Sequence, residues 1–246
     1  ISMSGYTIGR KTLHPEISQL CAGEYLLIRN GRLQERQYYR YSPWMERKST
    51  KSKLKEELTS VSRQVLEDIV EHANGRQIVI PLSAGNDSRF IASGMKELGV
   101  KDVYCFSYGI NNNFEVKTAK KVSEHLEYSW QYIPLSIAIQ KREFSESKFK
   151  DFWKYTDTLS NSPVLIDYSA VKLLKESGEI SKDAIFINGN SGDFITGGHI
   201  PPIYLDKCSS SIEELVRSIF SKHFSLWDCL KSESNVSKIQ NELKLF

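Results

Sequence analysis

The chain has 246 residues, of which 40% are hydrophobic and 26% charged, an ordinary globular composition, and it is long enough for one large domain or one domain plus a small appendage. Its formal net charge of +3 is too mild to indicate a nucleic-acid partner by itself. No apolar stretch reaches the ~18 residues that a membrane helix needs. The four scattered cysteines form no C-x-x-C pair, which argues against a zinc site or redox dithiol and favours a reducing cytoplasm.

The first forty residues predict a β-hairpin, with strands at 24–28 and 34–41 on either side of Asn30-Gly31, a strong signal for a tight turn. A basic polar stretch, 46–58, is interpreted as a solvated linker that runs into a helix. The helix is predicted up to residue 73 because apolar residues recur at helical spacing at Leu54, Leu58, Val61, Val65 and Ile69.

From residue 78 onward, short apolar strands alternate with amphipathic helices. Strands are predicted at 78–82, 103–108, 130–133 and 184–187, and helices at 88–98, 115–126 and 164–176. The last forty residues have a helical pattern, whereas 136–162 has none that can be assigned. The alternation predicts an α/β fold with a parallel sheet and helices on both of its faces.

The stretch "PLSAGNDSRF" (81–90) lies where the first of these strands would hand over to a helix beginning near Ser88. Ligands of open parallel sheets bind beyond the carboxyl ends of the strands, and a helix N-terminus there favours an anion such as phosphate. Ser83 and Ser88 supply hydroxyl donors, and Gly85 allows close approach of the backbone. Asp87 would repel phosphate unless Mg²⁺ lay between them. The alternative is that Asp87 and Ser88 simply cap the helix.

A second loop, "INGNSGDFITGGHIP" (187–201), follows the strand at 184–187 and carries one carboxylate, Asp193. If the two strand ends lie side by side, Asp87 and Asp193 could hold one metal–pyrophosphate between them. Neither G-x-x-x-x-G-K-[ST] nor G-x-G-x-x-G is present, which argues against a kinase-like P-loop and a dinucleotide fold.

The two loops carry a family resemblance. "LSAGNDSR" resembles the S-G-G-x-D-S loop of the PP-loop ATP pyrophosphatases, and "NGNSGDFITGGH" lies without a gap on the second-loop motif of asparagine synthetases. "CFSYG" (105–109) falls where that family has the strand bordering adenine, and residues 5–41 resemble the end of its glutaminase domain. The resemblance implies an adenine nucleotide alpha hydrolase-like (PP-loop) fold. It also implies a hairpin segment at 1–45 and a synthetase domain at 46–246 that is incomplete at its C-terminus.

The resemblance further implies an ATP- and Mg²⁺-dependent ligase that adenylates a carboxylate, releases pyrophosphate and transfers ammonia. The expected partners are a small-molecule carboxylate and ammonia or glutamine; neither nucleic acid nor a membrane is expected, and the hypothesis allows a homodimer. By position, the pyrophosphate-loop residues are Ser83, Gly85, Asp87 and Ser88, the nucleoside residues are Pro81, Tyr108, Asn188 and Gly189, and the metal ligands are Asp87 and Asp193.

Three positions depart from the family pattern. Ala84 replaces a glycine, Asn190 replaces a glutamate expected to accept a proton, and Phe194 replaces the glutamate after Asp193. Because an amide side chain cannot act as a base, the substrate is predicted to differ from aspartate. "DSR" and "HIP" resemble asparagine-synthetase-related proteins of bacterial surface-polysaccharide clusters, which suggests a sugar carboxylate. The alternatives are a nucleotide-binding module without catalysis and a PP-loop enzyme that thiolates tRNA.

Overall fold

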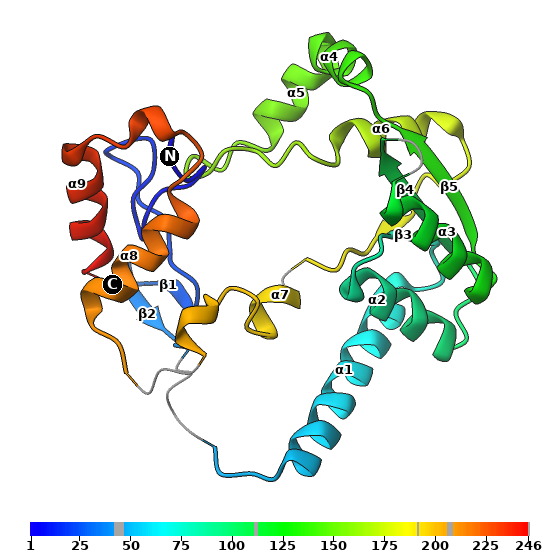
Figure 1. Ribbon diagram of the computed structural model, residues 1–246, viewed down its shortest axis with the longest axis horizontal. Coiled ribbons are helices and arrows are strands. Elements are labelled where there is room, and N and C mark those ends of the chain that lie inside the picture. The colour runs from blue at the N-terminus through cyan, green and yellow to red at the C-terminus, as the bar shows by residue number, and fades with distance from the viewer. Residues whose placement is uncertain (42–46, 111–112, 191, 206–208, 246) are drawn as a thin grey trace. The chain divides into compact units, whose positions relative to one another are not determined.

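The computed structural model describes residues 1–41, 47–110, 113–190, 192–205 and 209–245, with only the backbone at 194–195 (Figure 1). The chain forms two compact units. The first unit comprises Ile1–Arg47, Lys150–Val164 and Ile200–Phe246, and the second comprises Lys48–Phe149 and Leu165–His199. Residues 200–246 thus belong to the same compact unit as the N-terminal segment. The division of the chain into a hairpin segment at 1–45 and a synthetase domain at 46–246 stays a prediction.

The first unit contains the predicted hairpin, formed by β1 (Glu24–Arg29) and β2 (Arg32–Gln37). Asn30 and Gly31 connect the strands with φ of 50° and 71°, the left-handed conformation that a two-residue hairpin turn requires. Helices α8 (Ile212–His223) and α9 (Glu233–Leu243) confirm the helical pattern near the C-terminus. The small core of this unit is built on buried Met3, Phe220 and Phe224.

The second unit is built on a four-stranded parallel sheet in the order β5-β4-β3-β6. Its strands are β3 (Ile78–Pro81), β4 (Val103–Gly109), β5 (Ser129–Pro134) and β6 (Ile185–Phe186). The four strands confirm the predicted ones to within a few residues. The last is the shortest, because only Ile185 and Phe186 pair with β3.

Helices cover both faces of this sheet, as predicted. One face packs against α1 (Lys51–Ala73), α2 (Asn86–Glu97) and α3 (Phe114–Leu126), through a core that includes Ile80, Met95 and Cys105. The other face packs against α6 (Tyr168–Ser177), whose Leu174 is fully buried with Val79 and Phe106. In α1 the stripe used to predict the helix is largely exposed at Leu54, Leu58, Val61 and Val65, and the buried residues are Leu66 and Ala73.

The order of the strands creates a crevice at one edge of the sheet. The chain passes from β3 to β4 to β5 in one direction, with α2 and α3 on the same face. It then returns through α6 on the opposite face and adds β6 on the other side of β3. The strand order therefore changes direction between β3 and β6, and such a switch point is where a binding crevice opens in α/β sheets.

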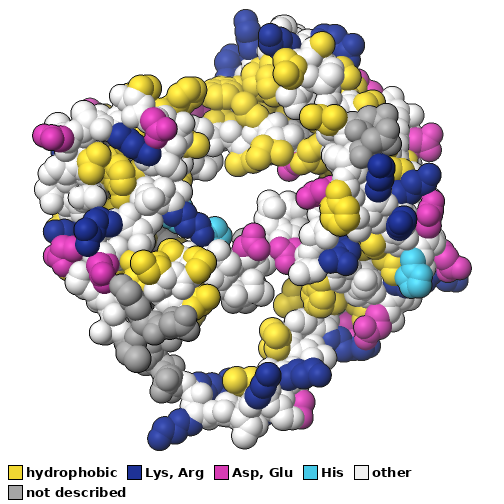
Figure 2. Space-filling view, in the orientation of Figure 1, with side chains coloured by type: hydrophobic (Ala, Val, Ile, Leu, Met, Phe, Trp, Pro, Cys, Tyr) yellow, Lys and Arg dark blue, Asp and Glu magenta, His cyan; other side chains and the backbone are white. Residues whose placement is uncertain are grey.

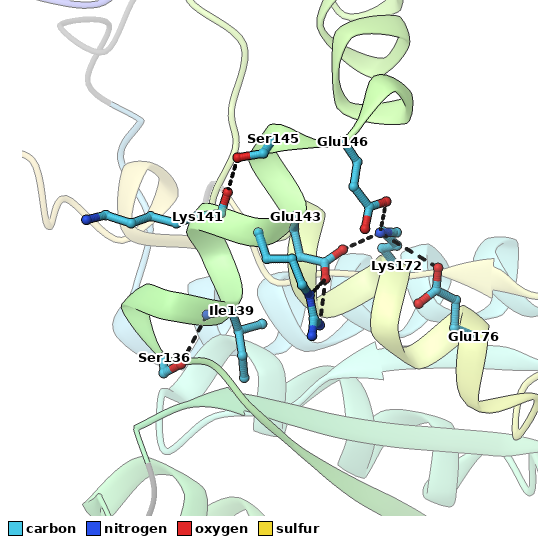
Figure 3. Close-up of polar contacts among 9 residues, drawn as sticks. Ser136, Ile139, Lys141, Glu143, Ser145, Glu146, Lys172 and Glu176 are labelled. Carbon is cyan, nitrogen blue, oxygen red and sulfur yellow. Dashed lines mark hydrogen bonds and ion pairs between the residues drawn. The ribbon is translucent and has the colours of Figure 1, made fainter.

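Two short helices occupy the region where the sequence shows no pattern, α4 (Ile137–Ser145) and α5 (Ser147–Tyr155). An ion-pair network attaches α4, and Glu146 between the two helices, to α6 (Figure 3). The Lys172 ammonium bonds to Glu143 and lies 2.6 Å from a Glu146 oxygen, while the Arg142 guanidinium lies 2.9 Å from Glu143. The Glu143 side chain is only 2% exposed, so this carboxylate depends on its two cations for compensation.

The surface is mixed in charge. Lys and Arg side chains lie among Asp and Glu side chains over the face shown in Figure 2, in keeping with the small net charge. None of the described helices combines the length and apolarity needed to cross a membrane.

Candidate nucleotide site

The crevice contains a cavity of about 330 Å³ at the carboxyl ends of β3, β4 and β6. All eight residues predicted to contact a nucleotide line it: Pro81, Ser83, Gly85, Asp87, Ser88, Tyr108, Asn188 and Gly189. The remaining lining residues are Leu82, Phe106, Ser107, Glu115, Val116, Asp167 and Asn190. The fold thus gathers the eight predicted residues from three separate segments, although nucleotide binding itself stays a prediction.

The loop between β3 and α2 is held by its own serines. The Ser88 hydroxyl accepts a hydrogen bond from the Ser83 amide at 3.1 Å and lies 3.1 Å from the Ser83 hydroxyl, which in turn accepts from the Gly85 amide at 3.0 Å. On the side of β4, the Ser107 hydroxyl donates to the Leu82 carbonyl at 2.7 Å. The loop is therefore shaped before any ligand arrives, which reduces the entropy lost on binding.

The geometry of this loop corrects the capping interpretation. Helix α2 begins at Asn86, two residues before the predicted start, and Gly85 occupies the N-cap position without a side-chain cap. Asp87 and Ser88 therefore lie in the first turn rather than at the cap. Gly85 has φ of −66°, and Ala84 is not among the residues with positive φ. Alanine thus fits at position 84, because the backbone there does not require a glycine.

The second loop lies directly against the first. A Cβ added to Gly189 would lie 2.7 Å from the Asp87 Cβ and 3.0 Å from the Ser88 amide nitrogen. A Cβ added to Gly192 would lie 2.5 and 2.6 Å from the two carboxylate oxygens of Asp87. These glycines are required by close approach, since neither has a positive φ. The predicted proximity of the two loops is confirmed, and Ser191 between these glycines lies outside the described residues.

The two predicted metal ligands differ in position. Asp87 is half-buried and lines the cavity, whereas Asp193 is exposed in the short helix α7 (Gly192–Ile195) and does not contribute to the lining. No hydrogen bond or ion pair engages either carboxylate within the described residues. Nor does the described part of the chain contain a cluster of three metal-ligating side chains. Two unpaired carboxylates fit Mg²⁺, which uses one or two carboxylates and takes its other ligands from water and phosphate.

The charge of the cavity supports this fit. Asp87, Glu115 and Asp167 line it, and no Lys, Arg or His is among its described lining residues. A phosphate chain in such a cavity needs a cation to offset the carboxylates, and the backbone amides at the start of α2 provide only partial positive charge. The site therefore suits a metal–phosphate complex better than a bare phosphate.

Phe106 and Tyr108 form an aromatic wall on one side of the cavity. Two acidic residues that the sequence alone did not identify, Asp167 and Glu115, also line the cavity. The Tyr108 hydroxyl donates a hydrogen bond to Asp167, and the Phe106 and Tyr108 rings stack with centroids 6.2 Å apart. Burial, together with the Asp167 carboxylate, raises the pKa of Tyr108 above its ordinary value of 10, so its hydroxyl remains a donor. The segment before α6 has no local motif, and only the fold brings Asp167 to this wall.

The chain was compared with models of protein families, with curated protein sequences and with solved structures. A family model described as asparagine synthase matches residues 62–242. No curated protein sequence matches the chain. Among solved structures, an NH3-dependent NAD synthetase from Campylobacter jejuni is 15% identical, with 77% of this chain and 93% of that chain covered and a TM-score of 0.35. A predicted subunit of tRNA methyltransferase from Methanocaldococcus jannaschii is 14% identical, with coverages of 68% and 74% and a TM-score of 0.29.

The family match, unlike these two distant structural likenesses, spans most of the chain and includes both loops and the strands that carry them. It confirms the predicted PP-loop type of α/β fold, which the parallel sheet with helices on both faces also displays. Membership supports an ATP-utilising, ligase-like function. The chain belongs to the asparagine synthase family.

Proposed function

We propose that this protein is an ATP-dependent ligase that activates a carboxylate and converts it to an amide. The substrate carboxylate attacks the α-phosphorus of ATP, giving an acyl-adenylate and pyrophosphate, and ammonia then displaces AMP. The observation that carries the proposal is the contact of the two loops, in which Gly189 and Gly192 approach Asp87 at the edge of a cavity lined by all eight expected nucleotide residues.

Each group has a role that follows from its position. The hydroxyls of Ser83 and Ser88 and the first amides of α2 would contact the phosphates that leave as pyrophosphate. Asp87 and Asp193 would hold Mg²⁺, which supplies positive charge to the phosphate oxygens. The stacked rings of Phe106 and Tyr108, with Pro81, form a wall suited to the nucleoside.

The substrate is proposed to differ from aspartate. Asn190 lines the cavity at the position where the family pattern has a glutamate, and its amide can form hydrogen bonds but cannot take a proton from the attacking amine. A sugar carboxylate is our candidate for the acid, with ammonia or glutamine as the nitrogen source. The second departure, Phe194, has a side chain that lies outside the described residues. A cytoplasmic location and a homodimer remain predictions.

The thiolation alternative is weaker. Cys105 is the cysteine in the second unit, where it is fully buried in β4, and burial raises the pKa of its thiol to about 12. A thiol in this state is a poor nucleophile. Cys21 and Cys229 belong to the first unit, and Cys208 lies outside the described residues. The described cysteines thus offer no reactive thiol at the cavity.

Two measurements test the proposal. Calorimetric titration of the chain with ATP, with and without Mg²⁺, should show binding that depends on the metal. Exchange of labelled pyrophosphate into ATP should then appear with a sugar acid and be far slower with aspartate. Binding without exchange for any acid tested would favour the noncatalytic module, and rapid asparagine formation from aspartate would refute the argument from Asn190.

A further inference from the structure

Asp167 occupies an unusual position at the start of α6. It stands at the N-cap of the helix, yet its side chain forms no capping hydrogen bond, and its backbone is already helical with φ of −90° and ψ of −13°. Aspartate at an N-cap ordinarily accepts a bond from its own helix. Here the carboxylate turns instead to the cavity, which it lines, and accepts a hydrogen bond from the Tyr108 hydroxyl.

This carboxylate lies at the aromatic end of the cavity. The phosphate-binding features, Ser83 and Ser88 with the start of α2, are at the end of β3. Asp167 is instead bonded to Tyr108, whose ring stacks with Phe106 at the end of β4. A nucleotide with its phosphates at α2 and its base against the rings would therefore bring the edge of the base toward Asp167.

The chemistry of Asp167 restricts what it can recognise. An ionised carboxylate offers about four acceptor sites and no donor. Within the described residues one hydrogen bond, from Tyr108, engages the side chain, so acceptor capacity remains for a ligand. The Tyr108 hydroxyl is itself committed as donor, which fixes the carboxylate in place. Such a group attracts an amino group and repels a carbonyl oxygen.

We propose that Asp167 is a specificity-determining residue that accepts a hydrogen bond from the 6-amino group of adenine and so excludes 6-oxo purines. This inference rests on the proposed function, because it requires ATP to enter the cavity. The other carboxylate at this end, Glu115, is exposed in the first turn of α3. Its charge contributes to the raised pKa of Tyr108, but among the described residues it forms no hydrogen bond with the Tyr108 hydroxyl. Glu115 is the matched control, because it is an acidic residue that lines the same cavity but does not share the Asp167 hydrogen bond to Tyr108.

The experiment measures dissociation constants for Mg²⁺-ATP and Mg²⁺-ITP, which differ in the base at the 6-position, by calorimetry on the complete chain. The wild-type protein should prefer ATP at least tenfold, and the triphosphate of unsubstituted purine riboside should fall between the two. Asp167→Asn can donate to a 6-oxo group, so it should reduce the ATP-to-ITP preference about tenfold or more. Glu115→Gln should leave the preference unchanged.

Several outcomes would overturn the inference. The first is a wild-type protein that binds ATP and ITP equally, a result that does not depend on any variant folding. The second is an Asp167→Asn protein that loses affinity for both nucleotides in proportion, as a merely structural role would predict. The third is a change in the preference for ATP over 2′-deoxy-ATP instead, which would place Asp167 at the ribose. If neither ATP nor ITP binds with Mg²⁺, the proposed function fails and this inference fails with it.

Discussion

Asp87 is the residue on which the metal hypothesis depends most directly. It lines the cavity, its carboxylate is unpaired among the described residues, and it sits in the first turn of α2 rather than at the cap. Asp87→Asn keeps the shape of the side chain but removes its charge. We expect this variant to weaken Mg²⁺-ATP binding roughly tenfold or more, about 1.4 kcal/mol, because the proposed metal ligand is lost.

Metal-free ATP provides the internal control for this variant. Because Asp87→Asn removes a negative charge, the affinity for metal-free ATP should be unchanged or slightly higher. Asp183→Asn, a change in the exposed turn before β6, should alter neither affinity. Equal weakening of both forms by Asp87→Asn, measured by calorimetry, would show that the residue supports the loop rather than the metal.

Gly192 offers a second test at the same contact. The added methyl of Gly192→Ala would lie 2.5 and 2.6 Å from the Asp87 carboxylate oxygens, so the two loops must separate. Overpacking of this kind costs about 1–3 kcal/mol, and we expect a lower affinity for Mg²⁺-ATP together with a lower free energy of unfolding. Gly85→Ala is the matched comparison, since its methyl would meet only the Ser83 hydroxyl, at 3.1 Å. A Gly192→Ala protein with unaltered binding would contradict the tight contact between the loops.

Among the helices, α4 and α6 show how a buried ion pair can hold an element in place. Lys172 lowers the pKa of Glu143 below its ordinary value of 4.5 through a direct hydrogen bond, with a further contribution from Arg142. Removal of one partner of a buried pair leaves an uncompensated charge. Glu143→Gln should therefore lower the free energy of unfolding by about 3 kcal/mol. Glu176→Gln, at the rim 3.8 Å from Lys172, should cost under about 1 kcal/mol.

The pH dependence of stability follows from the direction of the same shift. Because folding lowers the pKa of Glu143, its contribution is fully present above about pH 4.5 and is lost as the pH falls through the folded-state value. Urea unfolding of the wild type and of Glu143→Gln should therefore differ most near neutral pH and converge in acid. A difference that stayed constant down to pH 2 would show that the stabilisation does not come from the ionised carboxylate.

The same elements show what the sequence could and could not reveal. The strands at 78–81 and 103–109 and the helix between them were predictable because each buries an apolar run or stripe of its own. Helices α4 and α5 were not, since no buried hydrophobic residue lies in either and α4 buries only Glu143. The helix predicted from residue 164 begins at Tyr168, after an irregular stretch that follows Pro163. Asp167 belongs to that stretch, which is why the two loops were found from motifs and Asp167 was not.

At the scale of the molecule, every described residue of the candidate site belongs to the second unit. A ligand that binds only the native state protects the amides around its site from hydrogen exchange. We expect saturating Mg²⁺-ATP to slow exchange at residues 82–88 and 187–190, whereas the amides of the hairpin at residues 24–37 should exchange at unchanged rates. Protection confined to the hairpin would mean that the nucleotide binds elsewhere.

The position of β6 has a consequence for the time at which the site comes into existence. Strands β3, β4 and β5 follow one another along the chain. Strand β6, in contrast, is separated from its partner β3 by about a hundred residues of sequence, and it pairs with β3 through only two residues. Contacts between such distant segments form late and slowly, because the loop must close before they contribute. During synthesis the first loop can therefore be in place on the ribosome long before its glycine-rich partner has been made. The nascent protein should acquire affinity for ATP abruptly, once the residues around Gly192 have emerged and closed against Asp87.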